Sequence, residues 1–156
     1  MKVAPTLEGG LRIDPETAED WHVLRAILID ANSHDTDLAT RLGGMVTDER
    51  IAEDWRDFVV PDLRESFADD LNQIQAAIET AAAFPKDGAS PIWITRDDAF
   101  SWYSALNQAR LALEETYGFG PDPESDPSNL QPVRHEALLR SQFYCALQSF
   151  LLQHAL

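Results

Sequence analysis

The sequence predicts an all-α protein: an irregular bundle of about five or six helices with at most one short extended segment. Three observations support this prediction. Apolar residues recur at spacings of three and four through most of the chain, short links separate these stretches, and no series of alternating strands is visible. Neither a repeat nor a break in composition marks a second domain, so we expect one helical domain over residues 1–156.

The first two helices are predicted from their boundary signals. Asp14 is a suitable N-cap before Pro15, and Asn32 and Ser33 mark the end of the periodic stretch. The core-facing stripe of this helix is Trp21, Leu24, Leu28 and Ala31. A short second helix is expected over residues 37–42, because a glycine pair follows it.

The middle of the chain predicts two helices on either side of a proline. Thr47 is expected to cap the first of them, and Pro61, which has no N–H to donate, predicts a break or kink before a long helix. The apolar face of the first comprises Ile51, Trp55 and either Phe58 or Val59. The apolar face of the second comprises Leu63, Phe67, Leu71, Ile74, Ile78 and Ala81. Residues 48–70 contain nine acids and three arginines, and three minus nine leaves this hairpin-like region at −6.

The second half of the chain predicts one extended segment and another helix. Residues 84–91 contain turn-forming residues, and only residues 92–94 are expected to be extended, which alone cannot form a sheet. Thr95 and Asp98 resemble a capping box, so a helix should begin there and run toward Tyr117.

The chain is expected to end in a loop and a last helix. Gly118 and Gly120 should end the preceding helix, and four prolines keep the loop over residues 120–132 extended at the surface. The last helix follows Pro132. Over residues 138–152 it is apolar on nearly all sides, which predicts a position in the centre of the bundle.

Composition restricts the classes of function. The chain has 12 basic and 27 acidic side chains and a net charge of −15, which disfavours direct binding to nucleic acid. One cysteine, Cys145, excludes an intrachain disulfide, and its apolar neighbours predict a buried structural thiol. No apolar stretch is long enough to cross a membrane and no secretion signal is visible, so we expect a cytoplasmic protein.

No motif for a metal, a cofactor or a nucleotide is complete. Glu19 and His22 form half of a di-iron pattern whose second half is missing, and His135 with Glu136 lacks the second histidine of a zincin helix. Glycine-rich phosphate-binding loops are also missing. We therefore expect no catalytic residue, no metal and no cofactor.

Residues 94–115 are the most informative segment for a site. The candidate binding residues in it are Trp102, Tyr103, Asn107, Arg110 and Glu114. One interpretation is a solvated helix face with an ion pair between Arg110 and Glu114. Another is a contact surface in which aromatic rings flank a forked guanidinium. If Trp102, Asn107 and Arg110 face inward around a cavity, they indicate a small-molecule site instead.

The order of residues in this helix also carries a family resemblance. The matching positions are Thr95, Ala99, Trp102, Ala105, Leu106, Asn107, Arg110, Leu111, Ala112 and Leu113. With weaker similarity at Pro61, Asp62 and the last helix, the chain resembles the bacterial, mainly actinobacterial, domain-of-unknown-function family numbered 2017. The resemblance implies a cytoplasmic helical protein, often encoded beside the adaptor that delivers N-degron substrates to the Clp protease. Some members are described as regulators that respond to oxidation through a cysteine pair, a role that the single Cys145 does not allow here.

Together these patterns predict a non-enzymatic protein-interaction or regulatory factor, linked by analogy to Clp-adaptor-dependent proteolysis. Its contact surface would be the acidic region over residues 48–70 or the face of Tyr103, Asn107 and Arg110. A protein partner is expected, and a homo-oligomer is compatible with the sequence. The alternatives are a small-molecule-binding helical bundle or an enzyme with an unrecognised site, and then a transcriptional regulator that binds DNA.

Overall fold

The computed structural model describes residues 1–34, 36–83, 90–119 and 131–156. In these ranges most residues are helical, as the periodicity predicts, but a small three-stranded antiparallel sheet is also present. The fold is therefore mostly helical rather than all-α. The loops expected over residues 84–91 and 120–132 lie largely outside the described residues.

The sheet consists of β1 (Lys2–Pro5), β2 (Leu11–Asp14) and β3 (Ile92–Ile94), with β2 in the middle. The extended segment expected at β3 is confirmed, but the prediction that it forms no sheet is wrong. The N-terminal strand β2, far away in the sequence, pairs with it, and β1 pairs with the other edge of β2. Leu11 and Ile13 of β2 are fully buried, which joins the sheet to the hydrophobic core.

The first helix, α1 (Ala18–Ala31), begins later than predicted and ends at Asn32 as predicted. Its N-cap is Thr17, which forms a reciprocal capping box with Asp20. The prediction of Asp14 as the cap is wrong because strand pairing continues to that residue. The Asp14 carboxylate is instead bound by Arg12 of the same strand, at 2.7 Å.

Two short helices follow. Asp37 caps α2 (Leu38–Gly43) close to the predicted position. The next helix, α3 (Glu49–Asp54), is capped by Asp48, so the prediction that Thr47 is its cap is wrong by one residue.

The break predicted at Pro61 is a local change of helix type. A π-helical segment, η1 (Trp55–Val59), follows α3 and leads directly into α4 (Val60–Ala83), which has Pro61 in its first turn. The wider π turn accommodates a ring that would clash with the preceding turn of a regular α-helix. The chain therefore continues in one direction through the proline.

The helix predicted after Thr95 is confirmed as α5 (Arg96–Tyr117). It has the predicted capping box with Asp98 and ends at Gly118, whose φ of 56° is left-handed. The last helix, α6 (Pro132–His154), also begins where the sequence predicts.

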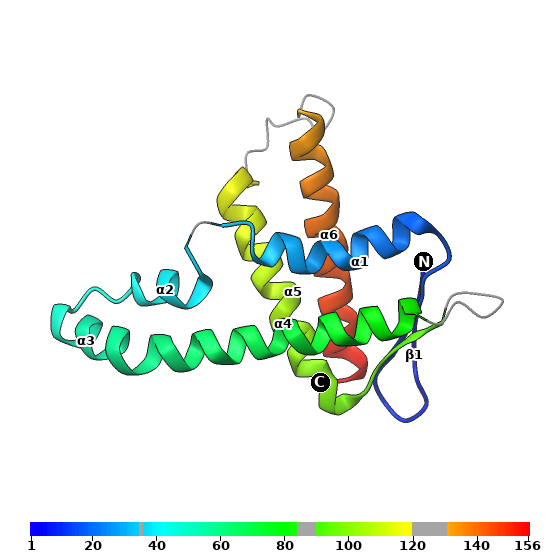
Figure 1. Ribbon diagram of the computed structural model, residues 1–156, viewed down its shortest axis with the longest axis horizontal. Helices are drawn as coiled ribbons and strands as arrows, with labels where there is room; N and C mark the ends of the chain where they lie inside the picture. The colour runs from blue at the N-terminus through cyan, green and yellow to red at the C-terminus, as the bar shows by residue number, and fades with distance from the viewer. Residues whose placement is uncertain (35, 84–89, 120–130) are drawn as a thin grey trace.

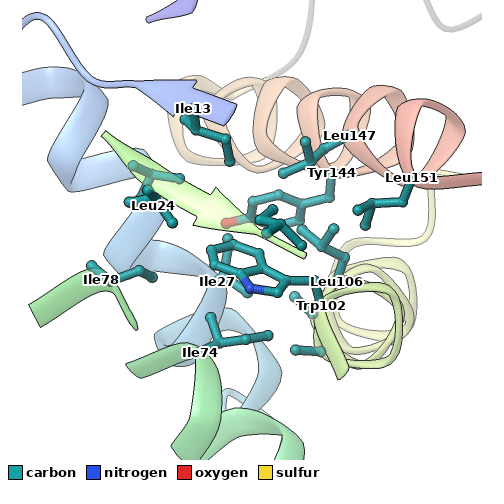
Figure 2. Packing of buried hydrophobic residues seen from close by; sticks show 14 of the residues in the cluster. Ile13, Leu24, Ile27, Ile74, Ile78, Trp102, Leu106, Tyr144, Leu147 and Leu151 are labelled. Atoms are coloured by element: carbon teal, nitrogen blue, oxygen red, sulfur yellow. The ribbon is translucent and has the colours of Figure 1, made fainter. Parts of the chain in front are cut away.

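The central helix is α5, and the prediction that α6 lies in the centre is wrong. Helices α1, α4 and α6 all pack against α5. By contrast α6 leaves Leu139, Phe150 and Leu152 exposed. Figure 2 shows Trp102 of α5 surrounded by side chains from α1, α4 and α6, including the ring of Tyr144. A helix that is apolar on most sides need not be covered on all of them.

Helix α4 extends well beyond the other long helices, as Figure 1 shows, and carries α2 and α3 at its far end. We call residues 37–70 the acidic arm and the sheet with α1, α5, α6 and the rest of α4 the body. Within the ranges that the structure describes, no helix is both long and apolar enough to cross a membrane.

Candidate functional site

The candidate residues of α5 are spread between the core and the surface. Trp102 is only 1% exposed and belongs to the hydrophobic core. Tyr103 is half-buried and packs against that core, Asn107 is half-buried, and Glu114 is exposed. The five residues therefore do not line one common cavity or one free surface.

Arg110 is held by a polar contact between α5 and α6. Its Nη1 donates a hydrogen bond to Oε1 of Gln148 at 2.6 Å, and Nε2 of Gln148 donates to the backbone carbonyl of Tyr103 at 3.2 Å. Gln148 is 3% exposed, so this contact is shielded from solvent. The guanidinium of Arg110 therefore links α5 to α6 and forms no ion pair with Glu114.

A buried polar cluster that the sequence analysis did not select lies between α1 and α6. Arg140 donates from Nε and Nη2 to the two carboxylate oxygens of Asp30, at 2.7 and 3.0 Å. The hydroxyl of Tyr144 donates to the same carboxylate at 2.7 Å. Asp30 is 4% exposed and Tyr144 is fully buried. The carboxylate thus has three donors, as a buried charge requires.

The protonation of this cluster is set by its surroundings. Burial raises the pKa of Tyr144 far above its ordinary value of 10.0, and the Asp30 carboxylate raises it further. The hydrogen bond to Asp30 raises the pKa of Arg140 as well. Tyr144 therefore stays neutral and Arg140 stays charged near neutral pH, as in a structural tie between helices.

The sequence contains a partial signal for this cluster. Arg140 is the only Lys, Arg, Asp or Glu in residues 137–156, and Asp30 follows three residues after the buried Ile27. A lone charge within an apolar face needs a partner if it is buried. The signal indicates that partners exist, but it does not say which ones meet.

The acidic arm combines unpaired acids with exposed apolar side chains. The side chains of eight of its acids make no hydrogen bond or ion pair with any described residue: Glu49, Glu53, Asp54, Asp57, Asp62, Glu65, Asp69 and Asp70. Met45, Ile51 and Phe58 are 74%, 55% and 71% exposed. Among residues 37–70 only Ala39, Val60 and Asp70 are buried. The arm therefore presents most of its side chains to solvent.

Ion pairs link α2 to α4 within the arm, and they also link the arm to α5 of the body. Arg64 of α4 donates to Asp37 at 3.1 Å. Burial of Asp37 alone would raise its pKa, but hydrogen bonds from Thr40 and Arg64 lower the pKa below its ordinary value. Where the arm meets the body, Glu115 of α5 pairs with Arg41 of α2 and with Nε2 of His34, the latter at 3.3 Å.

The remaining candidates give no reactive centre. Cys145 is exposed, so the prediction of a buried thiol is wrong, because α6 covers the body with only one of its sides. Among the described ranges no three His, Cys, Asp or Glu side chains are grouped so that they could hold a metal ion.

Comparison with known proteins gives one match. The model of a family described as "Domain of unknown function (DUF2017)" matches residues 3–155, nearly the whole chain. Neither the comparison with curated proteins nor the comparison with solved structures finds a match.

Proposed function

The chain belongs to the DUF2017 family. We propose that it is a non-enzymatic protein-interaction or regulatory factor. Its contact surface is the acidic arm, and its partner is a protein segment that is both basic and apolar. The observation that carries the proposal is the combination, on a projecting arm, of unpaired acids with exposed apolar side chains.

The charge of the arm supports a basic partner. Residues 48–70 carry nine acids against three arginines, and the side chains of most of these acids have no partner among the residues that the structure describes. Such a surface attracts a segment rich in Lys and Arg and repels nucleic acids and other acidic proteins. Electrostatic attraction of this kind accelerates association and weakens as salt increases.

The exposed apolar side chains support specific contact as well as attraction. Ile51 and Phe58 lie among the unpaired acids of α3, η1 and the start of α4, and Met45 precedes α3. Large apolar side chains beside polar ones are typical of a binding surface. A basic amphipathic segment would cover the apolar side chains and pair with the acids around them.

The α5 surface that the sequence offered as an alternative is less suitable for a partner. Arg110 is engaged with Gln148, and Trp102 is buried, so neither can meet another protein without rearrangement of the core. The family resemblance supports a cytoplasmic location and a role beside Clp-adaptor-dependent proteolysis. We therefore propose this location and this role for the chain.

The proposal is tested by photo-crosslinking in the native cell. Benzoylphenylalanine is placed at Phe58 of the arm or, as a matched control, at Phe100 of α5, which is 68% exposed. We expect an adduct from position 58 only, with the crosslinked segment of the partner rich in Lys and Arg. Its yield should fall as ionic strength rises above about 0.15 M.

Charge variants show whether the acids of the arm carry the contact. The double variant Asp54→Asn and Asp57→Asn should reduce the crosslinking yield about fivefold, since two rim charges contribute about 1 kcal/mol. The control, Glu19→Gln with Glu136→Gln, removes two exposed acids of the body and should leave the yield unchanged. Equal adducts from both Phe positions, or equal losses in both double variants, would disprove the proposal.

A further inference from the structure

A groove lies on the outer face of the sheet. The sheet is at the end of α4 opposite to the acidic arm (Figure 1). The strand register places Ala4, Arg12 and Trp93 in one row, and these three side chains face away from the core. The β1–β2 turn forms one wall and the first turn of α5 forms the other. The groove has a volume of about 690 Å³, which is in the usual range of small-molecule sites.

The floor of the groove is an aromatic ring. The Trp93 side chain is 54% exposed, and Leu7 at the tip of the turn is fully exposed. The Arg12 guanidinium lies 5.2 Å from the centre of the Trp93 ring. Asp14 binds that guanidinium at 2.9 and 2.7 Å, which neutralises its charge and fixes its position. A flat ligand can therefore stack on an indole that is already held in place.

A second guanidinium, that of Arg96, also lines the groove. Arg96 makes no hydrogen bond or ion pair within the described part of the chain. It lies so close to Gly9 that a Cβ at this glycine would be 2.2 Å from the Nε of Arg96. Gly9 has a φ of 83°, a left-handed backbone conformation that favours glycine. The β1–β2 turn and the Arg96 guanidinium thus lie side by side.

The surrounding charges restrict the ligand. Glu8 and Asp97 also line the groove, and the chain as a whole carries −15. These charges oppose a ligand with several negative groups, such as a nucleotide. A single carboxylate can still be held, because a guanidinium binds a carboxylate through two parallel hydrogen bonds.

We infer that this groove binds a small planar aromatic monocarboxylate. The ring of the ligand stacks on Trp93, and its carboxylate accepts hydrogen bonds from Arg96. This site is separate from the acidic arm, so it stands or fails independently of the proposed function.

The inference is tested with 2-naphthoate as the probe and the ¹⁵N-labelled chain. The indole N–H signal of Trp93 is assigned from its loss in Trp93→Phe. We expect saturable shifts of this signal and of backbone amides in the groove, with a dissociation constant of about 1 mM or lower. The neutral analogue 2-naphthamide should bind at least about tenfold more weakly, because it cannot form the charged pair with Arg96.

A matched pair of variants locates the carboxylate. Arg96→Gln should weaken 2-naphthoate binding at least about tenfold. Arg25→Gln should leave the affinity for 2-naphthoate unchanged. Arg25 is a matched control because its guanidinium also lies over an indole, 5.9 Å from the centre of the Trp21 ring. No saturable shift at Trp93, equal affinity for the acid and the amide, or equal affinity in Arg96→Gln would each overturn the inference. The comparison of acid with amide uses the unaltered chain, so it decides the question even if a variant does not fold.

Discussion

The body and the acidic arm each contain an aspartate–arginine pair that joins two helices, and the two pairs lie in very different surroundings. In the body, the Asp30 and Arg140 side chains are 5% and 23% exposed. In the arm, the Asp37 and Arg64 side chains are 44% and 55% exposed. The same kind of ion pair is therefore largely shielded from solvent in the body and exposed to solvent in the arm. The body depends on contacts that exclude water, whereas the arm does not.

The large apolar side chains show the same difference. Trp102 of the body is 1% exposed, and Phe58 of the arm is 71% exposed. The arm thus leaves apolar surface area exposed to water, although burial of that area would stabilise the fold. A region that contributes little to its own stability in this way is free to keep side chains available for a partner.

The largest difference between body and arm is expected in the free energy of unfolding when a large apolar side chain is removed from each. Trp102→Ala should reduce the free energy of unfolding by about 3–5 kcal/mol, because it leaves a cavity among α1, α4, α5 and α6. Phe58→Ala should change it by less than about 0.5 kcal/mol. Urea unfolding followed by circular dichroism measures both values. Similar losses in the two variants would contradict the contrast between arm and body.

A smaller effect is expected when the arginine of each pair is removed. Arg140→Ala should destabilise the protein by about 3 kcal/mol, because it leaves the buried Asp30 with the Tyr144 hydroxyl as its remaining donor. Arg64→Ala should cost less than about 1 kcal/mol, since its pair is exposed. Unfolding midpoints in urea measure the two values. A larger loss for Arg64→Ala than for Arg140→Ala would show that the arm is held more firmly than its exposure indicates.

The smallest effect concerns acid pH and the cap of α2. The pKa of Asp37 is lowered in the folded chain from its ordinary value of 3.8, so its charged form stabilises the fold above that pH. This contribution is lost as the pH falls through the lowered value. The amide of Thr40, which donates to Asp37 at 2.9 Å, should report the transition by NMR with a midpoint below 3.8.

The control for this titration is Asp37→Asn, which keeps a capping side chain and removes its ionisation. The low-pH transition of the Thr40 amide should disappear in this variant. A midpoint at or above 3.8 in the unaltered chain would show that burial, rather than hydrogen bonding, controls the Asp37 carboxyl.

Much of the helical structure is predictable because the signals for it are local. The capping box of Thr95 and Asp98 lies within one turn, and Gly118 ends the same helix. The first helix shows the limit of such signals. Asp14 has the features of a cap, but its pairing with Lys2 makes it part of a strand, and the cap moves to Thr17.

The site was harder to predict than the fold. Tyr103, Asn107 and Arg110 share a helix face in the sequence, but a helix face does not reveal which neighbour covers it. Gln148, far away in the chain, occupies the guanidinium of Arg110. The groove at Trp93 was missed because two regions far apart in the sequence form it, the β1–β2 hairpin and residues 93–97.

The sequence by itself determined where the long helices α5 and α6 begin, that the region over residues 48–70 is acidic, and that no complete motif for a metal or cofactor is present. Each of these depends on residues within a few turns of one another. Only the tertiary structure decided that β2 pairs with both β1 and β3, that α5 rather than α6 is central, and that Asp30 meets Arg140. Those outcomes depend on contacts between distant segments, because the stabilisation from burying a side chain depends on what the rest of the chain packs against it.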